Sequence, residues 1–352
     1  MNARTANVIG LGLVGGSVAL GLRERGWRVH GEDSTPGIGA RARDMGVIDA
    51  IGIHPEAEVT FVAVPVGAVA EQVKRALTET SGIVTDVGSV KAAVCAACDD
   101  PRFVGGHPMA GSELDGLDGA DGDMFQGAIW VLTPTLATAD LTLSAVSGIV
   151  RALGAEAIAL GPEQHDRVVA VVSHVPHLTA ATLMGLASDR SDEHAALLRL
   201  AAGGFRDMTR IASGHPDIWL DICAENRPAI LAALDGLIDG LTRVRGIVDT
   251  VDRAALHATL TTAREARTNL PSRVAHPESL AEVRIPIPDR TGAAAEVFTL
   301  AAELGVNIAN FEVVHMAEGK GVAVVLVDAA AAERFRGGLL ARRFKPAVTP
   351  LA

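Results

Sequence analysis

The sequence predicts an α/β protein made of three parts. Short runs rich in valine and isoleucine alternate with helical patterns over residues 1–161, which indicates a doubly wound, Rossmann-like sheet. Strand signals stop at Pro162, so we expect an all-helical region over residues 162–270. After a linker at residues 271–280, the pattern over residues 281–352 follows the order βαββαβ, the ferredoxin-like arrangement.

The expected strands of the first part are short and apolar. They are Ala6–Gly10, Arg28–Gly31, Val59–Val64, Ile83–Asp86, Phe103–Gly106, Ile129–Leu132 and Ala155–Leu160. Many are apolar on both faces, as in a mainly parallel sheet that is buried on both sides. Helical patterns such as Gly16–Arg25 and Val69–Glu79 lie between them, as connections between parallel strands require.

The helical region is expected to contain Pro162–Ala187, His215–Asn226, Pro228–Thr250 and Arg253–Asn269. Pro162 and Pro228 fit the first turn of a helix, where the missing N–H has no partner to lose. Pro176 falls inside an apolar helical stretch and is expected to kink it. Helices with such large apolar faces favour burial against a second copy of the chain, so we expect this region to form a homodimer.

The C-terminal part follows Leu270–Ser279, which contains two prolines. Its expected elements are Val283–Ile287 (strand), Thr291–Leu304 (helix), Asn307–Val314 (strand), Gly321–Val327 (strand), Ala329–Gly337 (helix) and Phe344–Val348 (strand). This order is the basis for the ferredoxin-like assignment.

Composition narrows the class of protein. Lys plus Arg total 31 and Asp plus Glu total 42, a net charge of −11 that argues against nucleic acid or an anionic membrane as partner. No run of eighteen apolar residues occurs, so no membrane span is expected.

Three cysteines, Cys95, Cys98 and Cys223, suit a reducing cytoplasm. Cys95 and Cys98 form a C-x-x-C pair, for which packing is favoured over metal binding while a redox role stays open.

A glycine fingerprint follows the first expected strand and opens the first expected helix. It comprises Gly10, Leu11, Gly12, Leu13, Val14 and Gly15. The first glycine of such a pattern permits a tight turn, the second lets the backbone approach a pyrophosphate, and the third allows close helix packing. The helix N-terminus stabilises the phosphates, so we expect a bound dinucleotide.

Asp33 lies 21 residues after Gly12, at the end of the second expected strand. A carboxylate there accepts hydrogen bonds from the ribose hydroxyls and repels a 2′-phosphate, which favours NAD over NADP. Arg41 and Arg43 follow and offer a phosphate site, and Asp33 alternatively caps the next helix.

A second motif, Phe103–Glu113, lies about ninety residues after the fingerprint and carries His107 among glycines. We expect these glycines to let a ligand approach the backbone. A histidine there can serve as a base beside a nicotinamide ring. A hydride acceptor with a nearby base indicates a dehydrogenase.

Taken together, several segments resemble those of the prephenate dehydrogenases. They are Thr85–Lys91, Gly105–Gly111, His165–Asp166, Ser173–His177 and Gly203–Arg210, followed by Trp219. The similarity runs from about residue 6 to residue 250, in order and at compatible spacings. The C-terminal unit, with Pro288–Gly292, looks like an ACT regulatory domain, which some members of the family carry.

The resemblance implies that prephenate and NAD give 4-hydroxyphenylpyruvate, NADH and carbon dioxide. His107 would accept the proton of the ring hydroxyl as hydride leaves, since the pKa of an unperturbed imidazole is about 6.5. Ser89 would help to orient His107 and the nicotinamide, a role compatible with capping a helix. Aromatisation drives the loss of the carboxylate, so the enzyme has to orient the substrate and stabilise developing charge.

Prephenate is a dianion, and the resemblance implies groups that bind it. Arg210 is the expected carboxylate clamp, because a guanidinium can donate two N–H groups to one carboxylate. Arg206 lies four residues earlier, on the same face of an expected helix. A solvated surface arginine is the alternative for Arg206, where family members often carry lysine.

His174 and His177 are expected beside the substrate as donors. A metal pair is rejected because no third ligand is evident, and packing near Pro176 is the rival role for His174. Asp166 is expected to pair with a cation near the entrance or to be a helix-surface carboxylate. Trp219 is expected in the site wall or in the core.

The ACT-like unit is expected to bind a small ligand, and tyrosine, the end product, is the expected inhibitor. Residues that match the family's ligand edge are Asp289, Arg290, Gly292, Asn307 and Asn310. Inhibition requires that tyrosine binds one global state better than another. The alternative is that the unit only aids dimerisation.

Three other functions compete with this one. An arogenate dehydrogenase would need an acidic group near the substrate amine, which the sequence does not locate. A β-hydroxyacid dehydrogenase generally uses a lysine on the long helix of its second domain, but Gln164–Ala187 contains none. A non-catalytic sensor of NAD and an amino acid is disfavoured because His107, Ser89 and Arg210 occur together.

Overall fold

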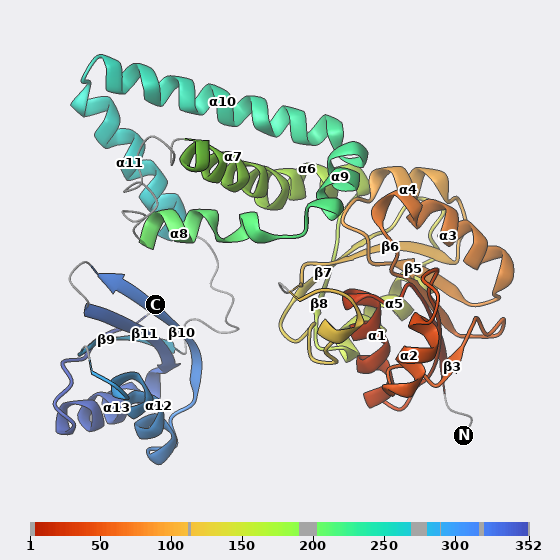
Figure 1. Cartoon of the computed structure of the whole chain (residues 1–352), viewed down its shortest axis with the longest axis horizontal. Helices are drawn as coiled ribbons and strands as arrows, with labels where there is room; N and C mark the ends of the chain where they lie inside the picture. The colour runs from red at the N-terminus through yellow and green to blue at the C-terminus, as the bar shows by residue number, and fades with distance from the viewer. Residues whose placement is uncertain are drawn as a thin grey trace. The chain divides into compact units, whose positions relative to one another are not determined.

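The computed structural model describes residues 4–111, 114–189, 203–268, 280–288, 290–316 and 320–350. The chain forms two compact units, the first comprising residues 1–199 and 208–246 and the second residues 200–207 and 247–352. Figure 1 follows the chain through both.

The first unit contains an eight-stranded sheet in the order β3-β2-β1-β4-β5-β6-β7-β8. The strands are β1 (Thr5–Ile9), β2 (Arg28–Glu32), β3 (Ala50–Ile51), β4 (Val59–Val62), β5 (Ile83–Asp86), β6 (Phe103–Pro108), β7 (Ile129–Thr133) and β8 (Glu156–Ala159). Strands β1 to β6 run parallel, whereas β7 pairs antiparallel with β6 and parallel with β8. The expected Rossmann-like, mainly parallel sheet is confirmed, with the short β3 as an addition.

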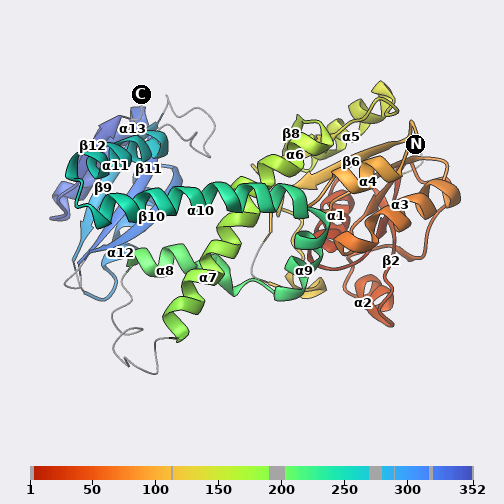
Figure 2. The ribbon, with the colours of Figure 1, turned by 90° about the horizontal axis from the view of Figure 1, so that it is seen from above.

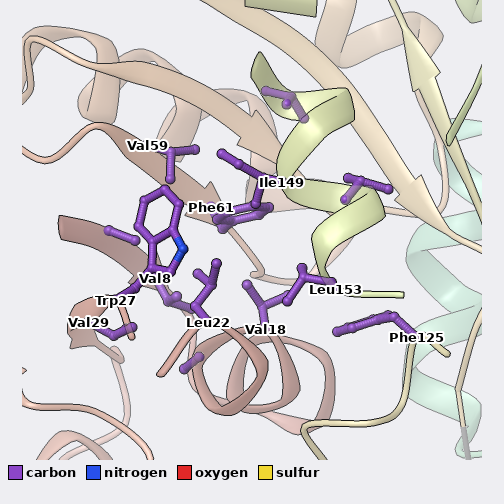
Figure 3. Close-up of a cluster of buried hydrophobic side chains, with 14 of the residues drawn as sticks. Val8, Val18, Leu22, Trp27, Val29, Val59, Phe61, Phe125, Ile149 and Leu153 are labelled. Atoms are coloured by element: carbon purple, nitrogen blue, oxygen red, sulfur yellow. The ribbon is translucent and has the colours of Figure 1, made fainter. Parts of the chain in front are cut away.

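Helices cover both faces of this sheet. They are α1 (Leu13–Glu24), α2 (Ile38–Asp44), α3 (Val66–Glu79), α4 (Ala92–Ala97) and α5 (Asp140–Ala152), with a short 3-10 turn at Leu117–Gly119. Buried side chains of α1, α2 and α5 form one core with β1, β2 and β4, and Figure 3 shows it around Phe61 and Trp27. Side chains of α3 and α4 form the core on the other face. Two cores explain why every residue of β4 is buried.

A single helical run follows the sheet. It consists of α6 (Pro162–Val169), a π-helical turn (Ala170–His174) and α7 (Val175–Asp189), and Figure 2 shows it without a break. Pro176 has no N–H for the carbonyl four residues earlier, and the π-helical turn ends two residues before it. The irregularity expected at Pro176 therefore takes the form of this turn.

Among the described residues, this run is the one helix that is long and apolar enough to cross a membrane. Length and composition alone pass that test, and core helices of water-soluble proteins pass it too. Its buried polar side chains, His165, Asp166, His174 and His177, suit a core helix that carries a site.

The remaining helices are α8 (Gly203–Thr209), a 3-10 segment (Arg210–Ser213), α9 (Pro216–Glu225), α10 (Arg227–Asp249) and α11 (Arg253–Thr268). The 3-10 segment packs against α7, and α9 packs against α3. Val90 of the β5–α4 turn shares a small core with Ala170, Ile222 and Ile230, so helical and nucleotide-binding regions meet there. The expected all-helical region is confirmed.

The C-terminal part of the second unit has the expected order βαββαβ. Its elements are β9 (Leu280–Ile287), α12 (Ala293–Glu303), β10 (Ile308–Met316), β11 (Lys320–Asp328), α13 (Ala329–Ala341) and β12 (Ala347–Pro350). The antiparallel sheet has the order β10-β11-β9-β12, and one core joins both helices to it. Residue 280 of the expected linker begins β9, and residues 271–279 lie outside the described residues.

The cysteines of the C-x-x-C pair are free thiols in the core beneath α3 and α4. Burial raises the pKa of Cys95 to about 11 and also raises that of Cys98. Both thiols therefore stay protonated at neutral pH, which favours packing over redox chemistry.

Candidate active site

The glycine fingerprint lies at the carboxyl end of β1, where the strand order reverses between β1 and β4. Gly10 has a φ of +93°, and a Cβ there would lie 2.3 Å from the carbonyl oxygen of Ala63. A Cβ on Gly15 would lie 1.9 Å from the carbonyl oxygen of Gly10. Nothing lies within 4 Å of the same position at Gly12. Gly10 and Gly15 thus shape the loop, and Gly12 leaves room for a ligand.

Helix α1 begins at Leu13 rather than at the expected Gly16, and its N-cap, Gly12, provides no side-chain cap. The first-turn N–H groups, including those of Leu13 and Val14, face the end where an anion binds best. The N–H of Leu11 donates to Asp33 Oδ2 at 2.8 Å. These features fit a dinucleotide pyrophosphate.

Asp33 also accepts the N–H of Thr35 through Oδ1 at 2.8 Å. Helix α2 has Gly37 as its N-cap and no side-chain cap, so Asp33 does not cap it. Arg41 pairs with Asp118, and Arg43 pairs with Asp44 at 3.1 Å. Both arginines that offered a phosphate site are thus engaged with carboxylates.

A chain of three buried side chains ends at His107. His107 Nδ1 lies 2.8 Å from His165 Nε2, and His165 Nδ1 lies 2.8 Å from Asp166 Oδ1. Asp166 further accepts the backbone N–H of Lys91 at 2.8 Å and of Ala92 at 2.9 Å. Asp166 is 4% exposed and caps α4, so its expected place at the entrance or on the helix surface is wrong.

The hydrogen bonds among these three side chains determine which ring nitrogens of the two histidines carry a proton. Burial acts to raise the pKa of Asp166, but the hydrogen bonds from His165, Ala92 and Lys91 lower it overall, so the carboxylate is ionised. It accepts from His165 Nδ1, so His165 Nε2 is left as the acceptor that faces His107 Nδ1. The unprotonated nitrogen of His107 is therefore Nε2.

Burial, the neighbouring His165, Lys91 and His174 hold the pKa of His107 well below its ordinary value of 6.5. His107 is therefore neutral at physiological pH. A neutral imidazole whose Nε2 has a lone pair and whose Nδ1–H donates to His165 is suited to accept a proton.

A buried ion pair holds the turn that carries Ser89. Lys91 Nζ donates to Asp86 Oδ2 and, at 2.9 Å, to the carbonyl oxygen of Gly106; both charged side chains are 0% exposed. Asp86 also accepts the N–H groups of Gly88 and Gly106. The turn is thereby tied to β6 next to His107. Ser89 is half-buried in it. Lys91 is the N-cap residue of α4, and Asp166, not Ser89, caps the start of that helix.

His107 lies inside strand β6, opposite Val131, and not in a loop after it. A Cβ on Gly105 would lie 2.4 Å from Thr133 Oγ1, and one on Gly106 would lie 2.6 Å from the Asp86 carbonyl oxygen. These two glycines therefore let neighbouring strands approach, and the expectation that they admit a ligand is wrong.

His174, His177 and Trp219 form a second group. His177 stacks on Trp219 with ring centroids 3.6 Å apart, and the ring of His174 is nearly perpendicular to that indole with centroids 6.1 Å apart. Burial lowers the pKa of His174 to about 4 and also lowers that of His177, so both are neutral. Trp219 thus packs between helix α7 and its own helix α9.

Arg210 and Arg206 do not share one α-helical face. Helix α8 ends at Thr209, and Arg210 begins the 3-10 segment that packs against α7. At the end of that segment, a Cβ on Gly214 would lie 3.3 Å from His177 Cε1. Arg210 is therefore on a segment next to the second group, whereas Arg206 belongs to the other compact unit.

The expected regulatory residues lie at the start of α12 and of β10. Arg290 is engaged with Glu296 through two contacts of 2.6 Å, and Gly292, with a φ of +83°, is the N-cap of α12. Asn307 and Asn310 are exposed, and Asp289 lies outside the described residues.

Among the described residues, no group of three or more His, Cys, Asp or Glu side chains is arranged so that it could hold a metal ion. Sequence reasoning missed His165, Lys91, Asp86 and Asn226 as site residues. Three of these, Asp86, Lys91 and His165, lie in the segments that carry the family resemblance, and that position was the signal available from the sequence. Asn226 gave no such signal, because it reads as an ordinary helix end.

Comparison with known proteins agrees with this geometry. Residues 18–159 match the family model "Prephenate dehydrogenase, nucleotide-binding domain" and residues 161–262 match "Prephenate dehydrogenase, dimerization domain". The prephenate dehydrogenase of Bacillus subtilis (strain 168) is 33% identical over 331 residues, which cover 89% of each chain. The cyclohexadienyl dehydrogenase of Zymomonas mobilis is 33% identical over 268 residues, 70% of this chain and 88% of that one.

Solved structures give the same result. The prephenate dehydrogenase of A. aeolicus, in complex with hydroxyphenyl propionate and NAD+, superposes with a TM-score of 0.72 and 30% identity over 77% of this chain and 99% of that one. The arogenate dehydrogenase of Synechocystis gives a TM-score of 0.66 and 29% identity, over 75% and 98% of the two chains. With its two matched regions in this order, the chain belongs to the prephenate dehydrogenase family.

Proposed function

We propose that this chain is an NAD-dependent oxidoreductase that converts prephenate to 4-hydroxyphenylpyruvate and carbon dioxide. The observation that carries the proposal is the buried chain His107–His165–Asp166, which leaves His107 Nε2 as a free acceptor. The glycine fingerprint lies in the same compact unit, at the carboxyl end of the parallel strands. NAD, when bound, accepts the hydride.

His107 Nε2 accepts the proton of the ring hydroxyl as the hydride leaves the carbon that bears it. The positive charge that develops on His107 is stabilised through Nδ1–H and His165 by the Asp166 carboxylate. Ser89, on the turn tied to β6, orients the hydroxyl and His107. Loss of the ring carboxylate then follows from aromatisation and needs no further residue.

The two carboxylates of prephenate need donors and positive charge. We assign Arg210 to one of them, with His177, His174 and Trp219 forming the adjoining wall. Arg206 is retained as a further contact, on the strength of the family resemblance alone. We do not assign Asp166 to the substrate, because its carboxylate accepts hydrogen bonds from His165 and from the first N–H groups of α4.

The cofactor is NAD rather than NADP. Asp33 lies beside the loop that would hold the pyrophosphate, where its charge repels a 2′-phosphate. Arg41 and Arg43 are engaged with Asp118 and Asp44, so neither is set aside for a phosphate.

Arogenate is the competing substrate, because one relative is named an arogenate dehydrogenase and another a cyclohexadienyl dehydrogenase. A non-catalytic sensor of NAD and an amino acid is the alternative of another class. The pre-organised base at His107 supports turnover over sensing.

We further propose a cytoplasmic homodimer with domains at residues 1–161, 162–270 and 281–352. Support for the dimer comes from the match to a dimerization domain and from exposed apolar side chains on its helices, such as Val171 and Val172 at 61% each. The βαββαβ order supports an ACT-type domain that binds tyrosine near Asp289–Gly292 and Asn307–Asn310. Tyrosine inhibition is then expected.

The test is NADH formation from prephenate or arogenate with NAD or NADP, with and without tyrosine, in the wild type and in His107→Asn. We expect the substitution to lower kcat by about a hundredfold or more while the Kd for NAD is unchanged. His257→Asn, a change of the same type at an exposed position on α11, is the control. Equal activity of His107→Asn and wild type would exclude the proposed base.

A further inference from the structure

Asn226 connects the two groups of the site. It is 3% exposed and follows the last residue of α9. Its Nδ2 lies 2.9 Å from the main-chain carbonyl oxygen of Asp166 and 3.2 Å from Nδ1 of His174. Asp166 is therefore bound through its side chain to His165 and through its main chain to Asn226.

The contact with Asp166 identifies the amide atoms of Asn226. A carbonyl oxygen can only accept, so the atom that faces it is the NH2 group. This group has a second hydrogen, and the other atom within its reach is His174 Nδ1. His174 Nδ1 is therefore an acceptor, and the proton of the neutral ring is on Nε2.

We infer that Asn226 is a positioning residue that holds His174 as the Nε2-protonated tautomer, opposite to that of His107. His174 is 1% exposed, and burial keeps it neutral. The charged or titratable groups that interact with it are Asp166, His165 and His107, and the Trp219 ring lies nearly perpendicular to its own ring.

The opposite tautomers give the two histidines opposite functions. His107 presents a lone pair at Nε2, which accepts the hydroxyl proton, and His174 presents an N–H at Nε2, which donates to an oxygen of the substrate. This second statement rests on the proposed function, because it takes prephenate as the molecule that His174 meets. The tautomer itself does not depend on the substrate.

The tautomer is measured first, by NMR on the full chain labelled with 15N-histidine and without substrate. His174 is assigned by its absence from the spectrum of His174→Gln. We expect its Nε2, the nitrogen coupled to both carbon-bound ring protons, at the shift of a protonated nitrogen. A wild type that turns over prephenate but carries the proton on Nδ1 of His174 overturns the inference and leaves the proposed function standing.

Asn226→Asp replaces the donor by an acceptor of the same shape, so it draws a proton to His174 Nδ1. We expect the KM for prephenate to rise about tenfold or more at neutral and alkaline pH, with the KM for NAD unchanged. Lower pH should restore binding, because a doubly protonated His174 again has a proton on Nε2. An unchanged KM at every pH would overturn the inference.

Asn7→Asp is the matched control for loss of stability. Asn7 is 0% exposed, and its Nδ2 also donates twice, to the His54 carbonyl oxygen and to Thr60 Oγ1. We expect this variant to lose stability without a change in the His174 resonances or a pH-dependent KM. A control that reproduced both effects would overturn the inference as well.

Discussion

Replacing His165 by phenylalanine tests whether the buried chain supports the base. Phenylalanine fills the volume of the imidazole but removes both nitrogens, so His107 Nδ1 loses its acceptor at 2.8 Å. That hydrogen bond is charge-assisted only after His107 has taken the proton, and such a bond contributes about 1.5–3 kcal/mol. Since about 1.4 kcal/mol corresponds to a factor of ten, kcat should fall about ten- to a hundredfold.

The assay is the initial rate of NADH formation at saturating prephenate, together with the Kd for NAD and the thermal midpoint. We expect kcat to fall while the Kd for NAD is unchanged, because the cofactor loop is built from β1 and α1. His30→Phe is the control, since His30 Nε2 is buried without a hydrogen-bond partner in the structure. A folded His165→Phe variant whose kcat stays within about twofold of wild type would refute the reasoning.

Three further outcomes are expected. Gly12→Ala should raise the Kd for NAD and leave the melting temperature unchanged, whereas Gly15→Ala should lower the melting temperature. The reason is that only the Cβ added at position 15 meets backbone, at 1.9 Å. Calorimetry and NAD titration distinguish the two effects. Lys91→Met should lower the free energy of unfolding by about 3–5 kcal/mol, since it leaves the Asp86 carboxylate buried without its cation, and an unchanged denaturation midpoint would contradict this. Because burial, His165, Lys91 and His174 depress the pKa of His107, the acid limb of kcat/KM should lie well below 6.5, and a limb at 6.5 would argue for an exposed base.

The same histidines set the pH dependence of stability. His107 and His174 take up a proton at ordinary pKa values only in the unfolded chain, because burial depresses their pKa in the fold. Above 6.5 both states are neutral and no difference arises. As pH falls below 6.5 the unfolded state binds more protons, so stability should decline there.

Local patterns in the sequence were sufficient for the elements that depend on nearby residues. The fingerprint glycines, the start of α6 at Pro162 and the order of the C-terminal elements all follow from short-range rules of turn, cap and periodicity. The direction of β7 did not follow, because alternation and apolar content are alike for parallel and antiparallel strands buried on both faces.

The site was harder to predict because its decisive contacts join residues far apart in sequence. His107 meets His165 across 58 positions, and Asp166 meets Lys91 across 75. A carboxylate next to a histidine on an expected helix gives no sign of whether it faces solvent or caps another helix. The sequence therefore predicts Asp166 near the entrance or on the helix surface, whereas in the structure it is buried at the start of α4.

The position of Asp166 explains why the site requires both the nucleotide-binding and the helical region. Helix α4 has no side-chain cap of its own, and its first N–H groups, from Lys91 and Ala92, are satisfied by a carboxylate that belongs to α6. The same carboxylate orients His165, and through it sets the proton on His107. Docking of the helical region and the protonation of the base therefore depend on one side chain. A substitution that loosened this docking would also disturb the tautomer of His107, even where it touched neither the substrate nor the cofactor.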